Sequence, residues 1–363
     1  GDKILFEQSV DISPEKPYVG EIPLPAAVRE EDLRVSLFSS SGSELISYSP
    51  VMPKNSPMPE PVKPPPAPKG IGTTEELYLT GLRLEQFYNP AFEPYPYYEE
   101  ALRRDPADSR VNAALGILYC KRGMFQEAES RLRVALDRLT RDYTSPKDGE
   151  AFYYLGVALS GQGKHDAAYD AFYKATWSRA FEGAGYYQLA QLTCRKGDFP
   201  KALYFVERAI SVNALNTKAL NLKAALLRRA SRYEEAKNLA ASVLALDPLD
   251  FLAGNEFCLA KSKLAPRSEA EDELTALNAK MRGEVQSYLE TAVDYANWAL
   301  WDEAMAVLSR LEDPDEANSK VYPMVYYYLG YLWEMKGEAA RAAKYYRLGS
   351  KMSPEYCFPF RLE

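Results

Sequence analysis

Histidine is almost missing from this sequence of 363 residues, in which His165 is the only one. A single imidazole excludes metal sites with two histidine ligands and leaves little for imidazole catalysis. The sequence also lacks any run near the ~18 apolar residues that a membrane span needs. Basic charge is not in excess, because 44 lysines and arginines face 51 acidic residues, for a net charge of -7. We therefore expect no nucleic-acid partner and no membrane span.

Cysteine is scarce and scattered, with no CxxC pair and no neighbouring histidine. This spacing excludes zinc and redox motifs, and a disulfide framework is not expected in a chain of this size. We predict buried free thiols at the four cysteines: Cys120, Cys194, Cys258 and Cys357. No charged, apolar and small-residue leader stands at the start. The first residue is Gly1, so we expect a piece of a longer protein, with the compartment open and the cytoplasm slightly favoured.

Residues 1–49 have the pattern of β structure. Residues 3–10 and 33–38 alternate in period two and are predicted to be strands, and a serine-rich turn ending at Gly42 leads to residues 45–48. The last two of these segments predict a hairpin. This region is either a small β-sandwich or the C-terminal strands of an upstream β domain.

A proline-rich linker follows over residues 50–73. Nine prolines lie between positions 50 and 69, which favours polyproline II and excludes a helix or a central strand. A ligand for SH3-type domains is the minor alternative to a semi-rigid spacer.

From residue 74 to residue 356 the sequence repeats about eight times. A small residue after a first-helix leucine or its equivalent recurs at intervals of 35, 40, 34, 34, 34, 34 and 38 residues. The markers are Gly81, Gly116, Gly156, Ala190, Ala224, Cys258, Ala292 and Gly330. Small residues at such positions let two helices approach closely, and glycines such as Gly123 and Gly163 stop the first helix in a left-handed conformation.

The repeats resemble the tetratricopeptide repeat (TPR), most clearly in Tyr326-x2-Leu329-Gly330-x2-Trp333, followed by Gly337, Ala342-x3-Tyr346 and Pro354. This resemblance implies a mainly α fold, a right-handed α-α superhelical solenoid, here preceded by a short β segment and a proline-rich linker. Residues 357–363 are expected to start a further helix or to be a truncated end.

We find no catalytic constellation in the sequence. His165 lies in a predicted turn between two helices, where we expect it to be solvated. The acidic runs at 30–32 and 99–100 are expected to be solvated faces, and the glycines at 70 and 72 follow no strand, which excludes a phosphate loop. We therefore predict a protein that is not an enzyme and holds no cofactor or metal.

Binding is the better candidate, because the resemblance implies a concave inner face lined by positions 2, 5, 9, 12 and 13 of each first helix. Tyrosine stands at position 5 of four units: Tyr78, Tyr153, Tyr187 and Tyr327. Such rings provide apolar area with a polar tip and suit the anchoring of a peptide. The alternative is that they only pack against neighbouring helices.

The inner-face positions of units four to six carry five cations and no carboxylate. They are Arg195, Lys218, Arg228, Arg229 and Lys263. We predict that they bind an acidic segment or a C-terminal carboxylate of a protein partner, the alternative being an ordinary solvated surface. The lysine and asparagine clamp of TPR chaperone adaptors is not found, which disfavours that role.

A narrower resemblance rests on the order of the segments, on residues 75–82 and on the ending 356–363. It is to large bacterial proteins in which an uncharacterised domain of unknown function, similar to the galactose-mutarotase β-sandwich, precedes TPR units. This resemblance implies a carbohydrate-related sandwich upstream, but no sugar-site residue carries over.

Three functions remain open. The first is a non-enzymatic interaction scaffold that binds a protein segment in the concave groove. The second is a helical accessory arm of a larger carbohydrate-binding or carbohydrate-active protein. The third is a structural spacer or self-association module, because Phe358, Phe360 and Leu362 near the end suggest a homodimer through solenoid ends.

Overall fold

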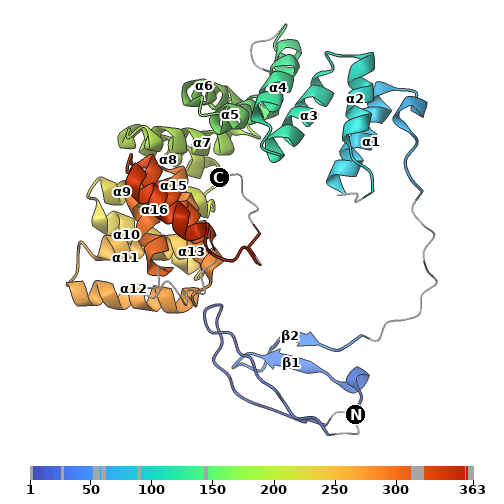
Figure 1. The fold of residues 1–363 in the computed structure, drawn as a ribbon. Coiled ribbons are helices and arrows are strands. Elements are labelled where there is room, and N and C mark those ends of the chain that lie inside the picture. The colour runs from blue at the N-terminus through green and yellow to red at the C-terminus, as the bar shows by residue number, and fades with distance from the viewer. Residues whose placement is uncertain are drawn as a thin grey trace. The chain divides into compact units, whose positions relative to one another are not determined.

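The computed structural model describes residues 3–25, 28–51, 58, 63–87, 91–142, 146–311, 323–355 and 357–358. It divides into two compact units, Gly1–Pro65 and Pro66–Glu363 (Figure 1). Part of the proline-rich linker, residues 312–322 and most of the ending 356–363 lie outside the described residues.

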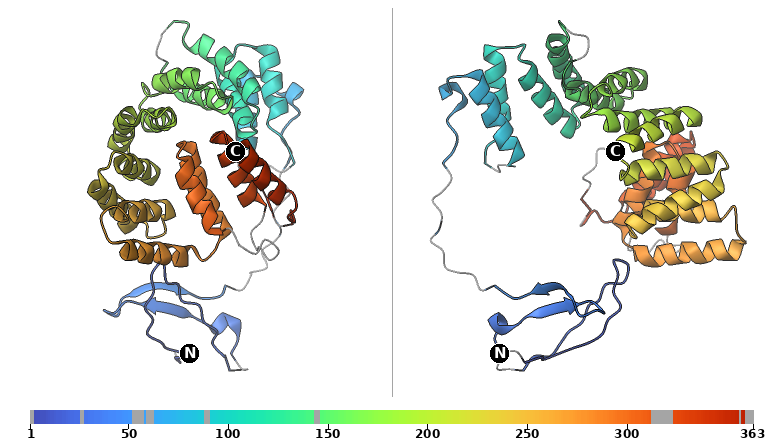
Figure 2. Two further views of the ribbon diagram at one scale, coloured as in Figure 1. Left: turned by 60° about the vertical axis from the view of Figure 1, so that its left-hand side comes forward. Right: turned by 180° about the vertical axis from the view of Figure 1, so that it is seen from behind.

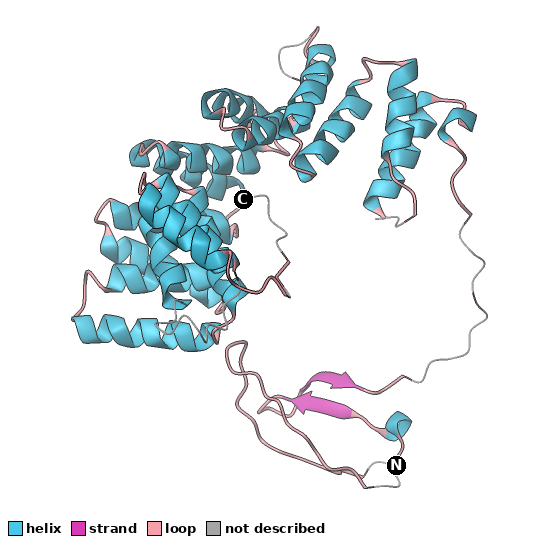
Figure 3. Ribbon diagram, viewed as in Figure 1, coloured by secondary structure: helices cyan, strands magenta, loops and turns pink. Residues whose placement is uncertain are grey.

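The first unit contains a β-hairpin (Figure 3). Strand β1, Val35–Phe38, pairs antiparallel with β2, Glu44–Tyr48, and places Leu37 opposite Ile46. Gly42 lies in the turn with φ +83°, a conformation that glycine adopts without strain. The hairpin predicted for this segment is confirmed.

The prediction of a strand over residues 3–10 is wrong. A strand needs a partner for its backbone groups, and no described strand pairs with this segment. No described residue of this unit is buried, and Val35 and Ile46 are 67% and 68% exposed. The hairpin therefore has no hydrophobic core of its own, and a two-stranded hairpin alone is marginally stable in water.

The described part of the second unit contains sixteen α-helices. The first eight are α1 (Thr74–Gln86), α2 (Tyr95–Arg104), α3 (Ser109–Lys121), α4 (Phe125–Leu139), α5 (Glu150–Gly161), α6 (His165–Ala175), α7 (Glu182–Arg195) and α8 (Phe199–Val212). The others are α9 (Thr217–Arg229), α10 (Tyr233–Leu246), α11 (Phe251–Lys261), α12 (Arg267–Met281), α13 (Val285–Asn297), α14 (Trp301–Leu308), α15 (Met324–Met335) and α16 (Ala339–Gly349).

Consecutive helices pack as pairs, from α1 with α2 to α15 with α16. Small residues make the close approach within a pair possible, as the sequence predicts. A Cβ atom on Gly156 would lie 2.6 Å from the ring of Phe172, and one on Gly330 would lie 2.5 Å from the ring of Tyr346. The large residue of the second helix therefore fills the space above the small residue of the first.

A left-handed residue ends the first helix of most pairs. Gly123, Gly163, Gly197 and Gly337 have φ between +72° and +79°, which confirms their predicted role. Ser231 and Ala299 take the equivalent positions after α9 and α13 with φ +59° and +57°. The turn geometry is therefore kept even where the sequence has no glycine.

The pairs stack along a curve, and α13 lies inside it (Figure 2). The largest hydrophobic core includes residues from α3 to α15, a smaller one joins α1, α2 and α3, and two small clusters pack α10 against α9 and α11. The curve brings first helices of middle units close to a hairpin of helices from late in the chain, and this positions the site described below.

We expect Gly156→Ala to destabilise the fold by about 1–2 kcal/mol, because overpacking against Phe172 outweighs the better helix propensity of alanine. Urea unfolding followed by circular dichroism measures this difference. The matched control is Gly183→Ala in α7, where the new Cβ would lie 3.3 Å from a methyl group of Val212. Equal stability of the two variants would contradict close helix packing at Gly156.

Candidate functional site

Three of the predicted inner-face tyrosines, Tyr78, Tyr153 and Tyr187, are half-buried, and Tyr327 is exposed. Tyr78 on α1 packs against Tyr98 with ring centroids 6.3 Å apart, and the guanidinium of Arg110 lies 5.1 Å from its ring. Tyr327 on α15 is 38% exposed and packs against Tyr346 at 6.5 Å. Each ring thus has a packed side and an accessible side.

Tyr153 on α5 is the most firmly held of the four. Its ring lies 5.4 Å from Tyr154, 5.6 Å from Phe172 and 5.4 Å from Phe181. The amide of Gln188 donates a hydrogen bond of 3.4 Å to its hydroxyl. Three ring contacts from α5, α6 and the start of α7 fix this side chain before any partner arrives.

Tyr187 on α7 faces the late helix α13. Burial raises the pKa of its hydroxyl, and the charge of Asp294 and the indole of Trp298, at and just after the C-terminal end of α13, act on the same group. This tyrosine therefore belongs to an internal contact between distant repeats more than to an open surface.

The predicted cations Arg195 and Lys218 also meet α13. Nη1 of Arg195 donates hydrogen bonds of 3.2 Å and 3.3 Å to the carbonyl oxygens of Ala296 and Asn297, which end this helix. Nζ of Lys218 forms an ion pair with Asp294. A guanidinium at the C-terminal end of a helix is favourable, because the last carbonyl groups carry partial negative charge.

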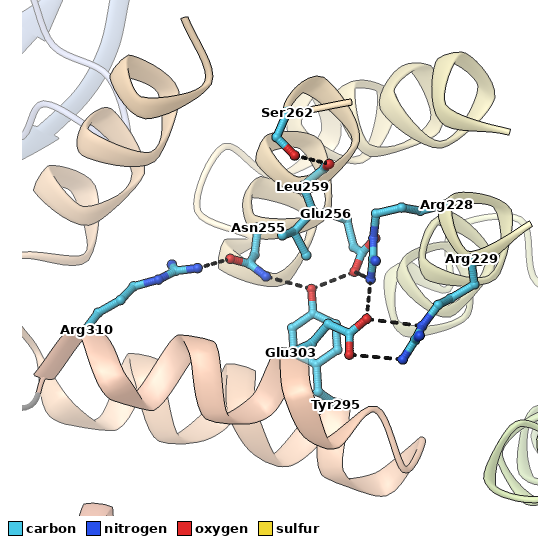
Figure 4. Close-up of polar contacts among 9 residues, drawn as sticks. All are labelled: Arg228, Arg229, Asn255, Glu256, Leu259, Ser262, Tyr295, Glu303 and Arg310. Atoms are coloured by element: carbon cyan, nitrogen blue, oxygen red, sulfur yellow. Dashed lines mark hydrogen bonds and ion pairs between the residues drawn. The ribbon is translucent and has the colours of Figure 1, made fainter. Parts of the chain in front are cut away.

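Arg228 forms the centre of a buried polar network (Figure 4). Its Nε and Nη2 donate to both carboxylate oxygens of Glu256 on α11, at 2.8 Å and 3.0 Å. Nη2 also donates to Glu303 on α14 at 3.0 Å, and Nε of Arg229 lies 3.2 Å from the same carboxylate. Glu256 is fully buried and Glu303 is 9% exposed.

Tyr295, Asn255 and Arg310 extend this network. The hydroxyl of Tyr295 on α13 donates to Glu256 at 2.7 Å and accepts from the amide of Asn255 at 2.8 Å. Arg310 lies in the short 3-10 helix Ser309–Leu311. Its guanidinium donates a hydrogen bond to the side-chain oxygen Oδ1 of Asn255. The chain of contacts thus joins α9, α11, α13 and the end of α14.

The pKa shifts of Arg228 and Arg310 in this network have opposite signs. Burial by itself lowers the pKa of Arg228, but the charge of Glu256 and its hydrogen bonds raise the pKa above its usual value. Burial lowers the pKa of Arg310, and no carboxylate of the described residues counteracts this effect. Described carboxylates therefore compensate the charge on Arg228, whereas among the described residues Arg310 has only the neutral side chain of Asn255 as a hydrogen-bond partner.

The structure thus brings four of the five predicted cations together but gives them partners from its own late helices. Lys263, which follows α11, is exposed and has no ion pair with a described residue. Sequence reasoning missed Glu256, Glu303, Tyr295 and Arg310. Position 6 of a first helix, where Glu256 stands, carries no signal by itself, and its arginine partner comes from another repeat.

The cysteines and the histidine lie outside the polar network. Cys120, Cys194 and Cys258 are buried free thiols, as predicted, and burial raises the pKa of Cys194 to about 12. Cys357 is also a free thiol but is only partly buried, so the prediction of burial is wrong there. His165 begins α6 and is partly buried, so the prediction of a solvated turn is wrong. Its pKa is lowered by burial and by the charges of Arg195 and Lys196.

No group of three potential ligands for a metal ion occurs among the described residues. In the same part of the chain, every helix is too short or too polar to cross a membrane.

Comparison with known proteins agrees with the paired-helix repeat fold. A model of the tetratricopeptide repeat family matches residues 115–184. The structure of PilF from Pseudomonas aeruginosa superposes with a TM-score of 0.50 at 16% identity, over 61% of this chain and 96% of that chain. The helices form a tetratricopeptide repeat solenoid. At such identity the likeness shows the fold alone.

Two further TPR proteins of known structure are similar over much of the solenoid. One from Parabacteroides merdae gives a TM-score of 0.48 at 18% identity, covering 68% of this chain and 94% of that one. The C-terminal part of one from Cytophaga hutchinsonii gives 0.44 at 14% identity, covering 78% and 95%. Residues 1–48 match a different family model, described as the second domain of a YphG-like protein.

We expect Arg228→Gln to lower the free energy of unfolding by about 3 kcal/mol, because it leaves the buried Glu256 without its cation. Urea unfolding measures the loss, since urea does not screen charge. Arg232→Gln is the control, because its ion pair with Glu235 is exposed to solvent at both ends and contributes little to stability. Losses of the same size in both variants would contradict the buried network.

Proposed function

We propose that the protein is a non-enzymatic interaction scaffold that binds a segment of a protein partner on the inner face of its first units. The observation that carries the proposal is the pair Tyr78 and Tyr153, which lie half-buried on α1 and α5, at position 5 of their repeat units, and pack on one side against other rings. Rings fixed in advance lose little entropy on binding and are good anchors.

The inner face of the later units is less suited to this role. Arg228 and Arg229 are bound to Glu256 and Glu303, and Lys218 is bound to Asp294. An acidic partner at these cations would have to displace carboxylates that the chain already supplies. This favours the tyrosine surface of α1 and α5 as the place where a partner binds.

A helical accessory arm of a larger protein is the second candidate. The match of residues 1–48 to the second domain of a YphG-like protein favours it, because it sets the repeats next to a domain of another kind. The relation of that domain to a galactose-mutarotase-like sandwich stays a prediction, as do a homodimer and an acidic partner.

We expect the double variant Tyr78→Ala and Tyr153→Ala to lose a partner that the unchanged chain captures from its native lysate. The loss follows because both anchors of the inner face are removed. The control is Tyr173→Ala with Tyr204→Ala, which removes two tyrosines that are 44% and 57% exposed on the second helices α6 and α8. Capture followed by mass spectrometry measures the difference.

Tyr153 also packs in the core, so thermal unfolding of each variant must accompany the capture. Tyr153→Phe keeps the ring packing and tests the hydroxyl alone. A partner that a folded Tyr78→Ala, Tyr153→Ala variant retains at full level would refute the tyrosine surface.

A further inference from the structure

Helix α16 presents an exposed row of positive charge in a chain that is acidic overall. Arg341, Lys344 and Arg347 lie on this helix and Lys351 lies in the turn after it, and all four side chains are exposed. Residues three or four positions apart share a side of a helix, and the buried Ala342 lies on the other side. We call these four cations the basic stripe.

This charge distinguishes α16 from the other second helices. Each of the seven from α2 to α14 contains at least one acidic residue, whereas α16 contains none. Residues 336–351 carry five cations and one acid, Glu338, in a chain with a net charge of -7. One of the five, Lys336, forms an ion pair with Asp302 and is not part of the basic stripe. A local surface of the opposite sign favours one specific anionic partner over general attraction.

An aromatic ring orients Arg341. Its guanidinium carbon lies 4.4 Å from the centre of the ring of Trp333 on α15. Stacking engages the flat face of a guanidinium and leaves its N–H edge for a carboxylate. The neighbouring acid on α15, Glu334, accepts a hydrogen bond of 2.6 Å from the hydroxyl of Tyr346. Because the ring already restricts Arg341, this side chain loses less entropy when a ligand binds.

We propose that the basic stripe binds an acidic segment of a protein partner. A carboxylate matches the edge of a guanidinium with two parallel hydrogen bonds. At about 1.5 Å of rise per residue, Arg341 and Arg347 are about 9 Å apart along the helix axis. An extended segment covers this length with about three residues, so its alternate side chains can reach both arginines.

Two observations favour a short acidic segment over a nucleic acid. Arg341 covers one face of Trp333, and this face is then not available for stacking a base. A long polyanion would also meet exposed acids on other second helices, such as Glu269, Glu271 and Asp272 on α12. A short segment avoids this repulsion, because exposed charges more than about 10 Å away are largely screened.

The proposal moves the acidic ligand expected from the sequence to a helix that the sequence did not single out. Arg228 and Arg229 on the inner face already bind Glu256 and Glu303. The basic stripe lies on a second helix, whereas the tyrosine surface lies on the first helices α1 and α5. Each of the two surfaces can therefore fail its test without the other.

The test is fluorescence anisotropy with the full chain and the fluorescein-labelled peptide Asp-Glu-Asp-Glu-Asp-Glu. The peptide Asn-Gln-Asn-Gln-Asn-Gln has the same shape without charge and is the reference. Oligothymidylate of the same length and vesicles of phosphatidylglycerol test the other classes of anion.

We expect the acidic peptide to bind and the amide peptide not to bind. The affinity should fall as sodium chloride rises from about 0.05 M to about 0.3 M, because exposed charges are screened. The triple variant Arg341→Gln, Lys344→Gln, Arg347→Gln should bind the acidic peptide about tenfold more weakly, since it loses three exposed ion pairs. Arg341→Lys should retain part of the affinity, because it keeps the charge without the fork.

The matched control is Lys69→Gln with Arg83→Gln and Lys147→Gln, which removes the same charge from exposed positions outside α16. This variant should bind the acidic peptide like the unchanged chain. Thermal unfolding of both triple variants shows whether they fold, which we expect because every changed side chain is exposed.

Four outcomes overturn the proposal. They are no binding of the acidic peptide by the unchanged chain, an equal loss of affinity in the control variant, tighter binding of oligothymidylate or of the vesicles than of the peptide, and self-association of the chain that the α16 triple variant abolishes. Sedimentation equilibrium measures the last of these, which would identify a second copy of the chain as the ligand of the basic stripe.

Discussion

The paired charge of Arg228 is the interaction on which the late half of the solenoid depends. Its guanidinium binds Glu256, 28 residues away in sequence, and Glu303, 75 residues away. Ordinary repeat packing joins each unit only to its neighbours, and stability is then a sum of local terms. This contact adds a non-local constraint, because α9 keeps its buried charge compensated only while α11 and α14 stay in place.

The same constraint explains the smaller contacts around it. Once α14 is held at α9, the preceding helix α13 must run along the inner face, and its C-terminal carbonyls meet Arg195 while Asp294 meets Lys218. Tyr295 is then enclosed completely and must satisfy its hydroxyl internally, which Glu256 and Asn255 do. Many polar residues on the inner face of these units are thus engaged in contacts within the chain.

Much of the fold could be predicted because a repeat encodes it locally. The marker at Gly156 and the turn glycine Gly163 lie within one unit, and the resemblance rests on such short spacings. The strand over residues 3–10 was predicted wrongly for the opposite reason. Alternation reports which side chains share a face, but a strand also needs a pairing partner, which the pattern of one segment does not contain.

The candidate site could be predicted only as a set of positions. The repeat register placed Arg228 and Lys218 on the inner face, and they do meet other groups there. What it could not supply is the curvature that brings α13 and α14 to the same face, since this depends on small rotations added over several units. Glu303 and Asp294 therefore could not be recognised as partners.

Charge balance, rather than charge sign, decides what the inner face can bind. A count of cations at the groove positions predicts an acidic ligand wherever arginines gather, yet Arg229 is held by Glu303 and gains little from a second carboxylate. Desolvating a charge is costly, so the group that gains most from a ligand is the one that the fold leaves uncompensated. By this argument the arginines at the end of α9, whose charges the fold already compensates, gain little from an anionic ligand and instead hold α11 and α14 against α9.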